Sequence, residues 1–287
     1  MQNSDIHNKV TIYTPESGLK NPGKLLSDMM KNLANSYELG WRLFRRNIKA
    51  AYRQSLLGLL WAFIPPIMTT LVWVFLNGQR IINIDDPGIP YPAFVLTSTL
   101  LWSVFAQSLM MPINVFKSGL AIMKKINFPK ESLLISGFFQ MGFDFMIKLV
   151  LIVAVFIVFQ VQPSATIFLA PIGVVVLVLL GSSIGLILLP LGMLYTDVQR
   201  MLSSIVPFWM LLTPVIYPTP REGLGVLLNK FNPVAPILTT TRDWMFTGQS
   251  DYMGSFVAIS IFVVIMTFLG LILFRLAIPF IIERSGS

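Results

Sequence analysis

Residues 166–195, TIFLAPIGVVVLVLLGSSIGLILLPLGMLY, contain no charged side chain. A helix needs about 20 mostly apolar residues to cross the hydrocarbon core of a bilayer. This segment therefore predicts a membrane-spanning helix. The fold of the chain then depends on how many segments of the same kind it contains.

The overall composition also indicates a membrane protein. Of the 287 residues, 55% are hydrophobic and only 12% are charged, and the mean hydropathy is +0.74. A soluble domain carries about 25% charged residues. This chain has too few polar side chains to cover a water-soluble particle of its size, so the composition excludes most classes of soluble enzyme.

Two residue counts narrow the chemistry further. There is no cysteine, which excludes disulfides, thiolate nucleophiles and cysteine-ligated metals. The single histidine, His7, lies in a polar N-terminal stretch. We therefore expect no catalytic residue and no metal site in this chain.

Five further segments are long and apolar enough to span a membrane. With an even number of spans, both termini lie on the same side. The six predicted spans cover residues 56–77, 92–116, 133–160, 166–195, 201–217 and 254–282.

The basic residues indicate which side that is. The chain has 21 Lys and Arg against 13 Asp and Glu. Sixteen of the 21 fall on the side of the termini and four on the opposite side, when the six spans are drawn as above. Positive residues stay in the cytoplasm, so both termini are predicted to be cytoplasmic. The net charge of +8 then needs no nucleic-acid partner.

Residues 36–53, SYELGWRLFRRNIKAAYR, carry apolar and basic residues on different faces at helical spacing. This pattern is typical of an amphipathic helix in the headgroup layer of a membrane. An ordinary basic flank that sets the topology is the alternative. The predicted helix is followed by a transmembrane domain of residues 54–282. Residues 1–35 before the helix and residues 283–287 after this domain are predicted to be cytoplasmic tails.

The loop of residues 218–252 is too long and too apolar to be a solvated loop, and four prolines break it. Irregular backbone at membrane depth has to be covered by protein. Residues 218–247 are therefore predicted to form re-entrant helices in the outer leaflet. The expected fold is an all-α membrane protein with six transmembrane helices, an N-terminal interfacial helix and these re-entrant helices before the last span.

Charged residues are rare inside the predicted spans. Asp144 and Lys148 are four residues apart in the third span, on one helix face where they can pair. Asp144 is the only acid in the six spans, which argues against coupling to protons or sodium.

A nucleotide site is also not expected. Residues 18–25, GLKNPGKL, fit the pattern G-x-x-x-x-G-K but lack the Ser or Thr that binds magnesium. Pro22 removes one of the amides that would cradle a phosphate. If the protein uses ATP, a partner has to hydrolyse it.

Five motifs follow one another between residues 36 and 282. They are YRQSLLGLLW (52–61) with Pro65 and Pro66, NFPKE (127–131), YTDVQR (195–200), TPVIY (213–217) and NPVAP (232–236) followed by Arg242. In this order they resemble the polysaccharide-export permeases, the membrane subunits of type-2 ABC exporters for O-antigen, teichoic acid and capsule. One departure is Thr196, where the family usually has Arg before the Asp.

The resemblance implies a homodimeric transport subunit with two separate ABC ATPase subunits beneath it. ATP and Mg would bind to those partners, so no cofactor is expected in this chain. The implied substrate is a polysaccharide on polyprenyl pyrophosphate, with O-antigen as the first candidate, crossing the inner membrane. Capsule or teichoic-acid export and small-lipid or drug export are alternatives within the family. An ATPase-independent lipid flippase is the alternative outside it.

On this hypothesis four groups of residues carry the function. Guanidinium groups bind phosphate in a bidentate manner, so the substrate pyrophosphate is assigned to Arg42, Arg45, Arg46 and Arg53. The glycan path is assigned to Tyr52, Ser55, Trp61, Trp102, Trp209 and Tyr217, although membrane anchoring is the alternative for each Trp. ATPase coupling, in a loop of residues 117–131, is assigned to Lys124, Lys125, Phe128, Pro129, Lys130 and Glu131. Gating or turn formation is assigned to Asp197, Arg200, Pro214, Asn232, Pro233 and Arg242.

Overall fold

The computed structural model describes residues 22–53, 56–82, 84–126, 128–220 and 222–286. Side-chain surroundings are described from residue 36 onwards, except at Lys124, Pro279 and residues 282–286. Within these residues all regular secondary structure is helical, which agrees with the predicted all-α class.

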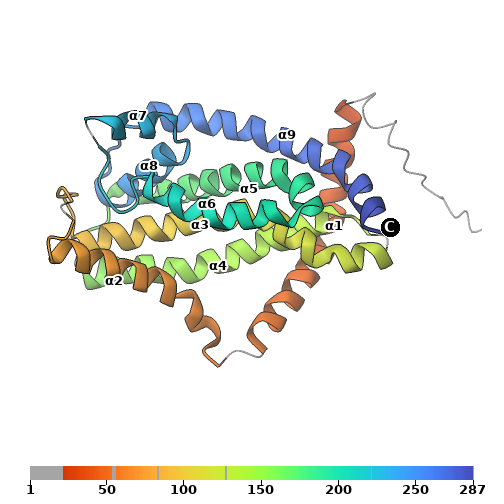
Figure 1. Ribbon diagram of the computed structural model, residues 1–287, viewed down its shortest axis with the longest axis horizontal. Coiled ribbons are helices and arrows are strands. Elements are labelled where there is room, and N and C mark those ends of the chain that lie inside the picture. The colour runs from red at the N-terminus through yellow and green to blue at the C-terminus, as the bar shows by residue number, and fades with distance from the viewer. Residues whose placement is uncertain (1–21, 54–55, 83, 127, 221, 287) are drawn as a thin grey trace, which may run out of the picture.

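The elements follow one another as a series of long helices with shorter ones between them (Figure 1). They are α1 (Pro22–Arg53), the 3₁₀ helix η2 (Gly58–Ala62), α2 (Ile64–Gly78), α3 (Tyr91–Lys125), α4 (Glu131–Val158), η3 (Ala165–Leu169), α5 (Ala170–Leu194), α6 (Thr196–Leu211), α7 (Leu224–Phe231), α8 (Val234–Phe246) and α9 (Met253–Gly286).

Among the described residues, four helices are long and apolar enough to cross a membrane. They are Tyr91–Met123, Glu131–Val158, Ala165–Leu194 and Met253–Ile278. By length and composition they confirm four of the predicted spans. The prediction for residues 166–195 holds, although its first turn is the 3₁₀ helix η3 that leads into α5.

The other two predicted spans are not continuous helices of that length. Residues 56–77 are divided between η2 and α2, because Pro65 and Pro66 occupy the first turn of α2 and a helix does not continue backwards through prolines. In residues 201–217 the helix α6 ends at Leu211, shortly before Pro214. The count of six spans therefore stays a prediction.

The long helices run side by side, with α5 in the middle of the bundle (Figure 1). α5 packs against α3, α9 and α8. α1 crosses the bundle at one end, and α7 and α8 lie at the other (Figure 1). These ends are called the α1 end and the α8 end below.

Glycines allow α3 and α5 to approach closely. A Cβ added at Gly181 would lie 2.7 Å from the carbonyl oxygen of Phe105 and 2.9 Å from the amide nitrogen of Leu109. Gly185, one helical turn further along, also faces the backbone of α3 at Leu109. Small residues at four-residue spacing are how helices in lipid bring their backbones together.

We predict that Gly181→Leu destabilises the protein, because the new side chain pushes α3 and α5 apart. Overpacking of this kind costs about 1–3 kcal/mol or more, so the melting temperature of the purified protein in detergent should fall. Gly142→Leu in α4 is the matched control, since a Cβ there meets nothing within 4 Å. Equal melting temperatures for the two variants would contradict the close α3–α5 contact.

Two boundaries differ from the sequence prediction. α1 begins at Pro22 rather than near residue 36, since no proline interrupts residues 23–64. α3 continues to Lys125, so the predicted coupling loop of residues 117–131 is wrong over 117–125, and only residues 126–130 connect α3 to α4. At about 1.5 Å per residue, α3 is about 52 Å long, well beyond the hydrocarbon thickness of about 30 Å.

The predicted direct pair of Asp144 and Lys148 is not formed. Lys148 is buried and its Nζ donates to Gln107 Oε1 at 2.8 Å. Asp144 instead accepts a hydrogen bond from Gln140 Nε2 at 3.1 Å. Asp144 and Lys148 are therefore each satisfied by a glutamine amide, one of which comes from α3.

Candidate functional site

The C-terminal half of α1 is amphipathic, but its apolar face covers protein. Leu43 and Phe44 are buried. The rings of Tyr37, Trp41 and Phe44 contact Phe139 of α4 with centroids 5.1–5.8 Å apart. The helix predicted to lie among lipid headgroups is thus anchored to α4 along one side.

The four arginines assigned to pyrophosphate binding all lie on the exposed side of α1. Arg42 forms an ion pair of 2.6 Å with Glu38, and Arg46 bonds to Asn47 Oδ1 at 3.1 Å. Exposed ion pairs of this kind are weak. The guanidinium groups of Arg42, Arg45, Arg46 and Arg53 are therefore available to an anion at the surface.

The residues assigned to the glycan path are only partly together. Trp102 and Trp209 lie 6.2 Å apart, and both contact Phe105. Trp102 is buried, with 4% of its surface exposed, so in the single chain it is a core residue. Trp61 is exposed on η2, and no ring contact of its own is found among the described aromatic residues.

Tyr52 and Tyr217 are both half-buried, at different places. Tyr52 lies at the end of α1, 6.3 Å from the ring of Phe143. Burial raises the pKa of Tyr52, and nearby Asp144 adds to the rise. Tyr217 donates to the carbonyl oxygen of Leu211 at 3.1 Å. Ser55, the remaining residue of the predicted path, lies outside the described residues.

The coupling residues form a compact turn between α3 and α4. The ammonium of Lys130 lies 4.9 Å above the ring of Phe128. Burial lowers the pKa of Lys130, and the charge of Glu131 opposes this. The carbonyl of Pro129 accepts a bond from Ser132. Lys125 is exposed at the end of α3, while the side chain of Lys124 lies outside the described residues.

At the α8 end, Asn232 ties three segments together. Its amide donates to Thr213 Oγ1 at 2.8 Å. Its carbonyl oxygen accepts from Trp209 Nε1 and from the backbone of Val234, both at 3.1 Å. Pro233 follows as the residue that caps α8. Asn232 thus fixes the start of α8 against the end of α6.

Arg242 is the most deeply buried charged residue that the structure describes at this end, with 5% of its surface exposed. Its Nη1 donates to Ser98 Oγ at 2.9 Å and to the carbonyl oxygen of Pro214 at 2.8 Å. The guanidinium also lies 4.0 Å from the ring centre of Phe94. Burial lowers the pKa of Arg242 to about 10, against the opposing charge of Asp243, so it stays protonated at neutral pH.

We predict that Arg242→Gln destabilises the α8 end, since it leaves the buried hydroxyl of Ser98 and the carbonyl of Pro214 without this donor. Each unsatisfied buried group costs about 1–3 kcal/mol, and the melting temperature should fall accordingly. Lys230→Gln, an exposed cation at the same end, is the control. If both variants have the melting temperature of the native protein, Arg242 does not hold this segment in place.

A polar cavity of about 470 Å³ lies between α3 and α6. α5 ends at Leu194 and Tyr195 adopts extended backbone, so that α6 starts in a new direction at Thr196. Residues at positions 196, 199, 200, 203 and 204 share one face of the new helix, because helical neighbours are three or four residues apart. The lining residues are Lys117, Thr196, Gln199, Arg200, Ser203 and Ser204.

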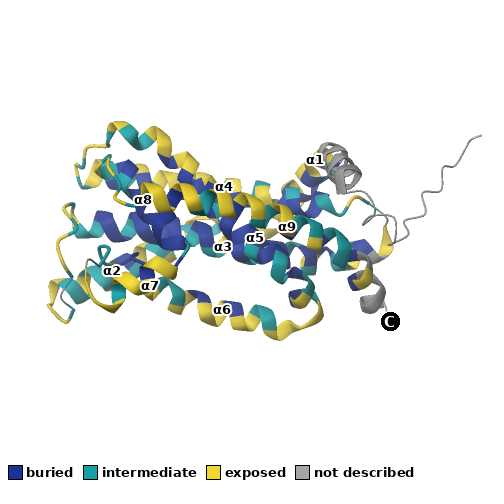
Figure 2. Ribbon diagram, turned by 90° about the horizontal axis from the view of Figure 1, so that it is seen from above, coloured by how far each residue is buried: buried dark blue, intermediate teal, exposed yellow. Residues whose placement is uncertain are grey.

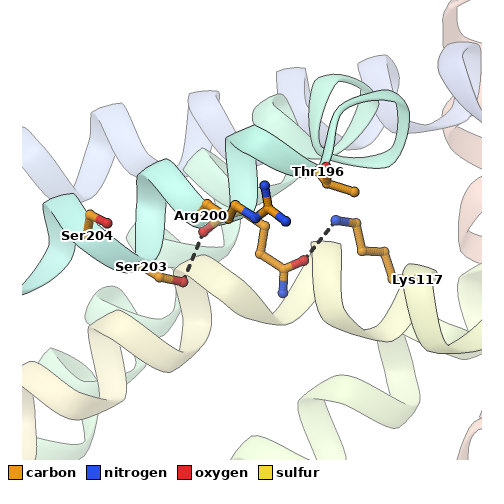
Figure 3. Close-up of a pocket in the computed structure, with 6 residues that line it drawn as sticks. Lys117, Thr196, Arg200, Ser203 and Ser204 are labelled. Atoms are coloured by element: carbon orange, nitrogen blue, oxygen red, sulfur yellow. Dashed lines mark hydrogen bonds between the residues drawn. The ribbon is translucent and has the colours of Figure 1, made fainter.

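Hydrogen bonds hold this cavity in shape (Figure 3). Lys117 Nζ donates to Gln199 Oε1 at 2.8 Å, and Gln199 Nε2 donates to Asn114 Oδ1 at 3.0 Å. Arg200 and Asp197, assigned to gating or turn formation, form an ion pair with 3.4 Å between Nη1 and Oδ1. Two cations and three hydroxyls around one space suit an anionic ligand.

A second cavity, of about 490 Å³, lies at the α8 end, and its lining includes Asp85, Asp86, Asp243 and Asp251 together with Arg242. Among the described residues no group of three or more His, Asp or Glu could hold a metal ion.

The sequence reasoning missed some of these residues. Lys117, Ser203 and Ser204 were not proposed as ligands, although the polar spacing from Thr196 to Ser204 signals a polar face on α6. Ser98 and Phe94 carry no local signal, since only packing brings them to Arg242.

The sequence profile of ABC-2 type transporters matches residues 38–246. The chain belongs to this family. The match spans α1 to α8, including the α3–α6 cavity and the Arg242 cluster.

Named relatives agree with the family match. The O-antigen export system permease protein RfbA of Klebsiella pneumoniae is 24% identical over 251 residues, which are 86% of this chain and 95% of that protein. RfbA of Myxococcus xanthus is 26% identical over 201 residues, 69% of this chain and 76% of that protein. The polysialic acid transport protein KpsM of Escherichia coli is 20% identical over 238 residues, 81% and 91% of the two chains.

These matches confirm the resemblance to type-2 ABC polysaccharide-export permeases. The chain is an integral membrane protein and a transport subunit, the permease of an ABC-2 type exporter.

Proposed function

We propose that this permease exports a polysaccharide linked to polyprenyl pyrophosphate, with O-antigen as the first candidate, across the inner membrane. The observation that supports this most is the match over 95% of the length of an O-antigen export permease. A capsular polysaccharide is the second candidate, supported by the match to a polysialic acid transport protein.

Energy comes from two separate ABC ATPase subunits, which bind ATP and Mg. In support, Asp144 is the only acid in the predicted spans, which leaves little basis for coupling to an ion gradient. The ATPases contact the turn of residues 126–130 together with Lys125 and Glu131. Because α3 is longer than the hydrocarbon thickness, it carries this turn beyond the membrane surface.

Two copies of the chain form the conduit, with both termini in the cytoplasm. The most hydrophobic 18-residue stretches of α4 and α9 are only 28% and 17% buried in the single chain. Such apolar surface has to be covered by lipid or by the second copy.

The segments η2–α2 and α6 supply the remaining two crossings. α7 and α8 form the re-entrant outer cover, and the burial of α8 fits this role (Figure 2).

The arginines of α1 attract the pyrophosphate to the cytoplasmic face. The glycan then follows Tyr52, Ser55, Trp61, Trp209 and Tyr217, and Trp102 supports Trp209 from behind. Asp197, Arg200, Pro214, Asn232, Pro233 and Arg242 form the turns that hold α6 and α8 in place during transport.

Deletion of the gene tests the function. We expect loss of surface polysaccharide and accumulation of lipid-linked glycan inside the cell, restored by the intact gene. The purified chain should copurify with a separate ABC ATPase, and inactivation of that ATPase should give the same defect. Normal surface polysaccharide in the deletion strain would contradict the proposal. Transport without any ATPase would favour a flippase.

The double variant Arg46→Ala with Arg53→Ala tests the role of the α1 arginines. We expect export to fall several-fold at normal expression, because two guanidinium groups no longer attract the pyrophosphate. Lys49→Ala, an exposed cation on the same helix, is the control and should export normally. Unchanged export in the double variant would contradict this role.

A further inference from the structure

We propose that the cavity between α3 and α6 binds the diphosphate group of a polyprenyl diphosphate lipid. This inference deepens the proposed function and rests on it for the identity of the lipid. It places the diphosphate at a second position, separate from the arginines of α1.

The charge of the cavity favours an anion. Lys117 from α3 and Arg200 from α6 both line it, and no carboxylate is among its lining residues. Figure 3 shows the guanidinium of Arg200 and the ammonium of Lys117 facing the same space between the two helices. Gln199 holds the Lys117 Nζ at 2.8 Å and is itself held by Asn114. One cation is therefore fixed in position before a ligand arrives.

Arg200 is free to exchange its partner. Its ion pair with Asp197 is 3.4 Å long, and the two side chains are 81% and 87% exposed. An exposed pair of this kind contributes little to stability. A doubly charged diphosphate is a stronger partner for the guanidinium, because it offers two oxygens to the fork of N–H donors.

Hydroxyl groups complete the site. The hydroxyl of Ser203 donates to the carbonyl oxygen of Gln199 at 2.9 Å, and the lone pairs of its oxygen remain available to accept a hydrogen bond. The hydroxyls of Thr196 and Ser204 are exposed, and neither has a hydrogen-bond partner among the described residues. Both can therefore donate to phosphate oxygens. From Thr196 to Ser204 the polar face extends about 12 Å along α6.

The surface of α6 also carries exposed apolar side chains. Met201, Ile205, Phe208 and Leu212 are 46–70% exposed, and their spacing places them in one stripe on the side of the helix turned away from the cavity-lining residues. Leu211, 42% exposed, lies seven residues after Ser204 and therefore on the same side as the cavity. The choice of a lipid over free pyrophosphate rests on the proposed function and is decided by the test below.

The size of the cavity is adequate. Its volume of about 470 Å³ lies within the range of small-molecule sites, about 300–1,000 Å³.

The test is binding by the full-length chain in lipid nanodiscs, with undecaprenyl diphosphate, undecaprenol and inorganic pyrophosphate as probes. We expect undecaprenyl diphosphate to bind most tightly. The double variant Lys117→Gln with Arg200→Gln should raise its Kd at least about ten-fold, since two charge-assisted contacts are lost. Lys230→Gln, at the α8 end, should leave the Kd unchanged. Arg200→Lys keeps the charge and should bind more tightly than Arg200→Gln.

Three results would overturn the inference. The first is an unchanged Kd in the double variant while its melting temperature matches that of the native protein. The second is undecaprenol binding as tightly as the diphosphate, which would assign affinity to the chain alone. The third is inorganic pyrophosphate binding as tightly as the lipid, which would make the ligand a free anion.

The outcome is separable from that of the proposed function. If deletion of the gene leaves polysaccharide export intact, the proposed function fails, while charge-dependent binding of undecaprenyl diphosphate in vitro still supports the site. If export requires the gene but the double variant binds and exports normally, the site alone is wrong.

Discussion

The close contact between the backbones of α3 and α5 at Gly181 and Gly185 sets the geometry of the whole bundle. In lipid no hydrophobic force drives helices together, so close packing and hydrogen bonds have to hold them. α5 repeats the device toward other neighbours: Gly173 faces Thr241 of α8, and Gly270 of α9 lies against Leu186 of α5. At each of these contacts one of the two helices has a glycine, so α3, α8 and α9 pack closely on α5.

This frame gives the two ends of the molecule different properties. At the α8 end, Arg242 and Asn232 are buried and satisfied by bonds to distant segments, which makes this end rigid. At the α1 end, cationic side chains remain exposed on α1 and around the α3–α6 cavity. The proposed export of an anionic lipid-linked substrate would use the exposed cations of the α1 end as its entrance and the α8 end as a fixed outer cover.

Much of the fold can be read from local composition. Four spans and the amphipathic part of α1 follow from hydrophobicity and helical spacing alone. Where local composition misleads, the reason is physical. The chain does not stop being helical where it leaves the bilayer, so α3 continues through residues expected to form a loop. Spacing within α4 suggested that Asp144 pairs with Lys148, but it cannot show that Gln107 of α3 offers Lys148 a nearer partner.

The sequence by itself determined that this is a helical membrane protein and which family it resembles. It also determined on which side of the predicted spans most basic residues lie. These properties depend on composition and on motifs along the chain. Only the tertiary structure decided which polar residues meet. Lys117 and Gln199 are 82 positions apart, and Ser98 and Arg242 are 144 apart. Such contacts depend on how the helices cross one another. The glycines of α5 contribute to the crossing of α3 and α8, because they fix how closely both helices approach α5.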